Sequence, residues 1–102
     1  MPVYNLNDVR KVAKIGKIEY RGRKVKRDIE NLGYELRDVQ RCLMSLTEDD
    51  FDKSHPYADS PTDDAYVVDF PNPADEDQTD RLYVKFRLLG DCLYINLGSF
   101  HV

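Results

Sequence analysis

An unbroken alternation of apolar and polar side chains runs through Leu82-Tyr83-Val84-Lys85-Phe86-Arg87-Leu88. Because successive side chains of a β-strand point to opposite faces of the sheet, the apolar residues share one face, and Tyr83, Lys85 and Arg87 share the other. A tight turn at residues 89–91 follows, and residues 92–97 are expected to pair back as the last strand of a hairpin. The stretch therefore predicts a sheet with one buried face and one polar face.

The first half of the chain shows helical spacing instead. Apolar residues at intervals of three and four predict three helices, over residues 6–16, 22–33 and 35–46. Gly16 and Gly33 suit the left-handed residue that ends the first two. Residues 17–20 alternate and predict a short extended piece between them.

Further strands are expected after the helices. Residues 51–57 predict a strand that Pro56 ends or confines to a sheet edge, and residues 65–70 predict another. Residues 71–80, which are acidic and contain two prolines, predict a loop. Helices followed by strands indicate an α+β protein, with three N-terminal helices packed on one face of a mainly antiparallel C-terminal sheet.

The length of 102 residues predicts a single domain over residues 1–102. No apolar run approaches the roughly 20 residues that cross a bilayer, and the N-terminus lacks a secretory pattern. We therefore expect a cytoplasmic protein with no membrane contact. Cys42 and Cys92 lie in apolar segments and are expected to be buried thiols. No cluster has metal-ligand spacing, so neither a metal nor another cofactor is expected.

The net charge of −4 is unevenly distributed along the chain. Residues 1–27 carry nine Lys or Arg and two acids, residues 28–80 carry three and sixteen, and residues 81–102 carry three and one. If the two basic ends meet in the fold, they form a face that attracts a polyanion. A solvated helix face without a partner explains the N-terminal run equally well.

One lysine stands out in the acidic middle. Lys53 is the only lysine between Arg41 and Arg81, and it follows four acids and precedes a hydroxyl, an imidazole and a phenol in Leu46-Thr47-Glu48-Asp49-Asp50-Phe51-Asp52-Lys53-Ser54-His55-Pro56-Tyr57. We interpret the acids at 48–50 as a turn at the helix exit. Lys53 is the candidate site residue.

The polar face of the 82–88 strand suits RNA. Ammonium and guanidinium groups bind phosphates, and tyrosine stacks on bases. Cleavage without a metal needs a base for the 2′-hydroxyl, a cation for the phosphorane and an acid for the leaving 5′-oxygen. The residues with this chemistry are Lys53, His55, Tyr83, Lys85, Arg87 and His101. A solvated sheet face without a ligand is the alternative.

Short motifs spread over nearly the whole chain resemble the MqsR family of type II toxin–antitoxin toxins. They are, in chain order, Leu6-x-x-Val9-x-Lys11, Leu46-x-x-x-Asp50-Phe51-x-Lys53-Ser54, Tyr66 or Phe70, Tyr83-Val84-Lys85 and Asp91-x-Leu93-x-Ile95. The resemblance implies a fold like that of the RelE-type and microbial ribonucleases. It also implies a metal-independent endoribonuclease that cleaves mRNA, an mRNA interferase. The implied partner is a cognate antitoxin, a DNA-binding helix-turn-helix protein, in a hetero-oligomer.

The resemblance also assigns residues. The active-site lysine of the family falls on Lys53 and its catalytic tyrosine on Tyr83. His55 stands where the family has methionine, and His101 aligns with a C-terminal lysine if Ser99-Phe100-His101 is taken as the family's ending. A family glutamine has no clear match. The expected catalytic residues are Lys53, Tyr83, His55 and His101, and the expected RNA-binding residues are Lys85, Arg87 and Tyr57.

Two other functions stay open. The missing glutamine and lysine fit a catalytically inactive, toxin-like module that binds an antitoxin or RNA without cleavage. The basic N-terminal run fits a small RNA-binding protein that acts through Lys24, Lys26 and Arg27.

Overall fold

The computed structural model describes residues 1–102. Its helices are α1 (Leu6–Lys14), α2 (Gly22–Leu32) and α3 (Leu36–Ser45), with a 3-10 turn η1 (Glu48–Asp50). Its strands are β1 (Ile18–Tyr20), β2 (Phe51–His55), β3 (Asp63–Asn72), β4 (Asp75–Leu89) and β5 (Tyr94–His101). The three expected helices and the α+β class are confirmed.

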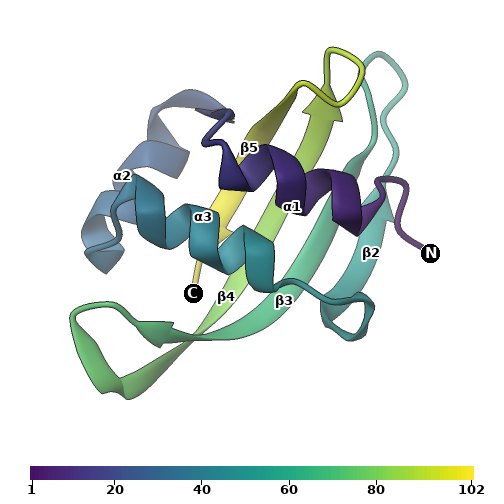
Figure 1. Ribbon diagram of the computed structural model, residues 1–102. Helices are drawn as coiled ribbons and strands as arrows, with labels where there is room; N and C mark the ends of the chain where they lie inside the picture. Colours follow the sequence, from purple (N-terminus) through teal and green to yellow (C-terminus); the bar gives the residue numbers. More distant parts are fainter.

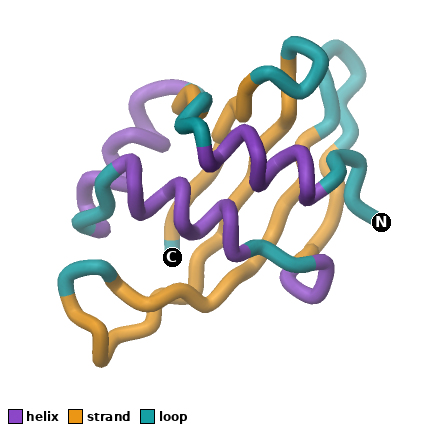
Figure 2. The backbone as a smooth tube through the Cα atoms, viewed as in Figure 1, coloured by secondary structure: helices purple, strands orange, loops and turns teal.

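The strands form one sheet in the order β1-β5-β4-β3-β2. Every neighbouring pair is antiparallel except β1 and β5. Helices α1 and α3 lie side by side across one face of the sheet, and α2 lies further back, beside β5 (Figures 1 and 2). No helix covers the opposite face, which we call the open face.

Local signals set the helix ends. The Asn5 side chain accepts the backbone N–H of Asn7 at the start of α1, which satisfies one of the free donors there. Helix α2 ends at Gly33, whose φ of 80° is left-handed and strains any residue with a Cβ atom. Glu35 and Asp38 form a capping box at the start of α3.

The core lies between the helices and the covered face of the sheet. Leu82, Val84, Phe86 and Leu88 of β4 are all buried in it, so the predicted alternation is confirmed. Tyr66 of β3 stacks on Phe86 with ring centroids 5.6 Å apart. Each fully buried side chain of this size stabilises the fold by roughly 1.5–3 kcal/mol through removal of apolar area from water.

The prediction of a loop at residues 71–80 is wrong. Strand β3 continues through Asn72 and β4 begins at Asp75, so these residues form a hairpin. Pro71 is tolerated because β2 pairs with β3 only as far as Tyr66, which leaves a free edge beside Pro71. Buried Asp80 accepts hydrogen bonds from the side chains of Tyr34, Asn72 and Gln78, and these bonds hold the base of the hairpin.

Two other expectations need correction. Strand β5 begins at Tyr94 and runs to His101, not from 92 to 97, because residues 90–93 make the turn. Asp91 and Cys92 have positive φ angles in that turn, and Cys92 is exposed, not buried. Cys42 is buried, as expected. No helix is long and apolar enough to span a membrane.

Candidate functional site

Strands β2, β4 and β5 bring most of the predicted site residues together on the open face. Lys53 pairs with Ala65, which pairs with Lys85 on its other side. Tyr83 pairs with Val67 on one side and His101 on the other. Because side chains at directly paired positions point to the same face, these groups form a continuous polar surface.

His55 and Tyr83 make the central contact of this surface. The Nε2 atom of His55 lies 3.1 Å from the Tyr83 hydroxyl oxygen, which is a hydrogen-bond distance. The His101 ring packs against the Tyr83 ring, with centroids 5.5 Å apart and a tilt of 33°. Two imidazoles thus flank one phenol. They come from β2 and β5, the strands on either side of the β3–β4 pair.

Ala65 explains how the contact is possible. By the strand register, Ala65 lies on β3 between His55 and Tyr83, and its side chain is fully buried although it is on the open face. A larger side chain here would stand between the imidazole and the phenol. Lys53 and Lys85 flank Ala65, roughly 10 Å apart at their Cα atoms from the usual strand spacing.

The environment of Tyr83 keeps its phenol protonated. Partial burial raises the pKa of Tyr83 above its ordinary value, and the negative charges of Asp52 and Asp63 raise it further by smaller amounts. Near neutral pH, the hydroxyl is therefore a proton donor and not a phenolate.

Arg87 and Tyr57 lie next to His55 on the open face, but both are bound to the buried carboxylate of Asp63. Arg87 donates to it through Nε at 2.8 Å and Nη2 at 3.2 Å, and the Arg87 side chain is only 11% exposed. The Tyr57 hydroxyl donates at 2.9 Å, and the Arg87 guanidinium lies over the Tyr57 ring. Asp63 pairs in register with His55, so this network fixes the end of β2 that carries His55.

Arg21 was not among the predicted residues. It follows β1, reaches across β5 and β4, and donates to Asp63 through both terminal nitrogens at 2.9 and 2.8 Å. It passes over Gly98, where a Cβ atom would lie 2.5 Å from Arg21 Nη1. A glycine inside a strand is the one sequence signal of such a close approach.

The acidic stretch before Lys53 has a structural role. Thr47 and Asp50 form a capping box around η1, which confirms the interpretation of these acids as a turn. Ser54 points to the covered face, where its hydroxyl donates to Asp64. Lys53 and His55 are therefore the members of this stretch that the open face displays.

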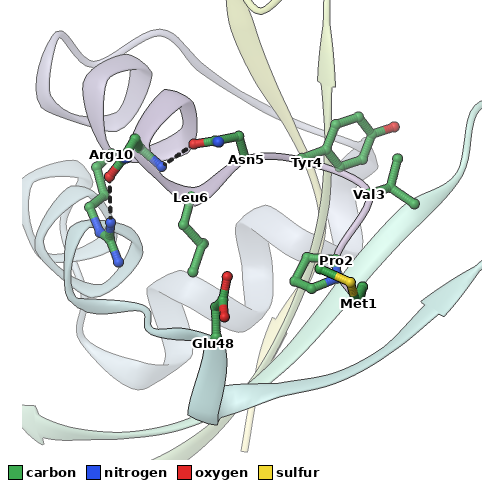
Figure 3. A pocket seen from close by; sticks show the side chains of 9 residues that line it. Met1, Pro2, Val3, Tyr4, Asn5, Leu6, Arg10 and Glu48 are labelled. Atoms are coloured by element: carbon green, nitrogen blue, oxygen red, sulfur yellow. Dashed lines mark hydrogen bonds between the residues drawn. The ribbon is translucent and has the colours of Figure 1, made fainter.

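One hollow of the surface lies away from the predicted site residues. A pocket of about 480 Å³ is lined by the N-terminal segment, Arg10 and Glu48 (Figure 3). Arg10 already donates to Asn7 and to the Leu46 carbonyl oxygen. None of the predicted site residues lines this pocket. No group of three or more His, Cys, Asp or Glu side chains is arranged to hold a metal ion.

The fold and the open face define a small α+β protein with a polar, cationic and imidazole-bearing sheet surface. The family described as "Motility quorum-sensing regulator, toxin of MqsA" matches the chain over residues 1–101. The chain belongs to this MqsR toxin family, and so to the toxins of toxin–antitoxin systems. No individual curated protein matches the chain.

Proposed function

We propose that this toxin is an endoribonuclease, an mRNA interferase, which cleaves mRNA on the open face of its sheet without a metal ion. The observation that carries the proposal is the contact of 3.1 Å between His55 and Tyr83, with His101 against the same phenol. Lys53 and Lys85 lie on the same face. An acid, a base and cations are the three components that the reaction needs.

RNA supplies its own nucleophile. The 2′-hydroxyl oxygen attacks the neighbouring phosphorus, and the P–O5′ bond breaks as the P–O2′ bond forms. A base accepts the 2′-hydroxyl proton, and an acid gives a proton to the departing 5′-oxygen. The products then end in a 2′,3′-cyclic phosphate and a 5′-hydroxyl.

In this proposal Tyr83 is the acid. Its raised pKa keeps the proton on the phenol, and His55 returns a proton to it through their contact. His101 is the base. Its Nδ1 lies 3.1 Å from a main-chain oxygen of Val102, which accepts and does not donate, so Nδ1 carries the hydrogen and Nε2 is the nitrogen that takes up the proton.

The cations bind and stabilise the phosphate. Lys53, an exposed residue of β2, stabilises the extra charge of the phosphorane, and Lys85 holds the same strand of RNA from β4. Arg87 adds positive charge beside them. The ring of Tyr57, a residue that is 41% exposed, is available to stack on a base.

We further propose that a cognate antitoxin binds this toxin in a hetero-oligomer and holds it inactive. The family description as the toxin of MqsA supports such a partner. The expected antitoxin is a helix-turn-helix protein that binds DNA. Because mRNA is the proposed substrate, the cytoplasm is the proposed location.

Substitution of Lys53 tests the proposal. Induced expression of the unaltered protein should arrest growth, and Lys53→Ala should restore it. The purified variant should cleave RNA about 100-fold more slowly or worse, because removal of one contact to transition-state charge typically costs roughly 10²–10³-fold. Lys11→Ala is the control, since Lys11 is an exposed lysine on α1, over the other face of the sheet.

Full cleavage by Lys53→Ala would contradict the assignment. If the unaltered protein binds an antitoxin tightly but cleaves no RNA, it is instead an inactive toxin-like module.

A further inference from the structure

Helix α2 carries a cluster of unpaired positive charges. Arg23, Lys26 and Arg27 are exposed and make no ion pair or hydrogen bond through their side chains, whereas Lys24 pairs with Asp28 at 2.7 Å. With about 100° of rotation per residue, the three lie within one arc of about 100° that points away from the core side of the helix. Only Glu30 shares that arc. We call these three residues the α2 cluster.

The helix stands beside the proposed catalytic surface. Strand β1 pairs with residues 95–97 of β5, and α2 packs against β5 as well (Figure 1). Arg21, the residue before α2, lies across the open face to Asp63. Tyr34, just after α2, packs on Phe100 with ring centroids 5.6 Å apart, and Phe100 precedes His101. The N-terminal end of the helix thus adjoins the open face, whereas its C-terminal end is held on the covered side of β5, where Phe100 is buried in the core.

Other exposed cations lie elsewhere. Lys11 and Lys14 are on α1 and Arg41 is on α3, the two helices that lie across the covered face of the sheet (Figure 2). None of these three side chains makes an ion pair. They provide the same charge as the α2 cluster at a different place.

A local cation track is needed because the whole chain is acidic. A net charge of −4 repels RNA at long range, and binding then depends on where positive charge is concentrated. Single-stranded RNA is usually held by a positive groove or edge that follows its backbone.

We infer that Arg23, Lys26 and Arg27 bind backbone phosphates of the RNA strand that flank the cleaved bond, so that α2 extends the substrate site past the edge of the sheet. This inference rests on the proposed ribonuclease function. Because the contacts are to phosphates, they strengthen binding for any base sequence and leave the chemical step unchanged.

The test compares two triple variants of the full-length protein. One replaces the α2 cluster by glutamine (R23Q, K26Q and R27Q), and the other replaces Lys11, Lys14 and Arg41 by glutamine. Both lower the net charge by the same amount, and glutamine retains helix propensity. Binding of a labelled, 2′-O-methylated single-stranded RNA is measured over a series of salt concentrations, and cleavage of an mRNA transcript gives kcat and KM.

The α2 variant should bind RNA more weakly and lower the slope of log affinity against log salt by about 2, since each single-strand phosphate contact contributes about 0.7. It should raise KM without changing kcat, and the control should match the unaltered protein. Unchanged binding by the α2 variant, or equal weakening by both variants, would overturn the inference. So would loss of antitoxin binding with RNA binding intact.

The unaltered protein and its Lys53→Ala variant, run in the same series, report separately on the ribonuclease function. Cleavage that depends on Lys53 but not on the α2 cluster overturns only the α2 inference. Absence of RNA binding by the unaltered protein would overturn both.

Discussion

The Nε2 atom of His55 lies 3.1 Å from the hydroxyl oxygen of Tyr83, although β3 separates the strands that carry them. The contact crosses the fully buried methyl group of Ala65. A proton can pass between an imidazole and a phenol at the centre of the open face.

Tyr83→Phe removes the hydroxyl and keeps the ring that packs on His101. If Tyr83 is the acid, kcat should fall by roughly 10²–10⁴-fold, the usual contribution of general acid catalysis. Thermal unfolding should change little. Tyr94→Phe is the matched control, because Tyr94 is a tyrosine on β5 with no hydrogen bond through its hydroxyl, and it should cleave normally. Normal cleavage by Tyr83→Phe would contradict the role of acid.

Tyr57 has two separable parts, a hydroxyl bound to Asp63 and a ring available to RNA. Tyr57→Phe should keep RNA affinity and lose a little stability. Tyr57→Ala should weaken RNA binding by about 1–3 kcal/mol, the usual value for stacking on one base. Fluorescence anisotropy with an uncleavable RNA measures the difference. Equal affinity of both variants would show that the ring does not contact RNA.

The lowered pKa of Asp63 predicts that the protein loses stability in acid. Burial alone would raise its pKa, but hydrogen bonds from Arg21, Arg87 and Tyr57 outweigh burial and hold it well below the usual range. Below about pH 4, where an unfolded aspartate takes up its proton, the unfolded chain gains a proton that folded Asp63 does not. The free energy of unfolding should therefore fall as pH decreases below that value. Urea titrations at several pH values measure it.

Asp63→Asn provides the comparison. It leaves two guanidinium groups without their buried counter-charge, so the variant should be less stable at neutral pH by about 3–5 kcal/mol. Its further loss of stability in acid should be shallower than that of the unaltered protein. Identical pH dependence in the two proteins would exclude Asp63 as the titrating group.

The two cysteines should react at very different rates. Cys92 is exposed in the turn before β5, whereas burial, with a smaller contribution from Asp50, raises the pKa of Cys42 to about 12. A thiol reagent should label one cysteine quickly in the native protein, and Cys92→Ser should abolish that labelling. Rapid labelling of two thiols would contradict the placement of Cys42 in the core.

Sequence periodicity was enough to predict which side chains of β4 lie on the covered face of the sheet. Its four apolar residues at every second position predict one buried face whatever strand lies beside them, and the same alternation placed Tyr83 and Lys85 opposite. The hairpin at 71–80 was missed because its composition is that of a loop. The hairpin is stabilised instead by the hydrogen bond that Tyr34, 46 residues away in the chain, donates to Asp80.

The arrangement of the site depends on contacts that no local pattern contains. His55 reaches Tyr83 only because of the register of β2 on β3, which shifts between Phe51 and Lys53. Arg21 reaches Asp63 across 42 residues of chain, over a glycine that gives it room. Composition and spacing named the candidate side chains, but pairing across strands decides which of them meet.

The end groups of the cleaved RNA provide the most direct test of the ribonuclease proposal. Purified protein is incubated, in buffer that contains a chelator, with an RNA that it cleaves. A parallel reaction uses the same RNA with a 2′-deoxy sugar at the cleaved position. The proposal predicts 2′,3′-cyclic phosphate and 5′-hydroxyl ends from the first RNA and no cleavage of the second at that position. Fragments with 5′-phosphate ends, or cleavage at the 2′-deoxy position, would contradict it.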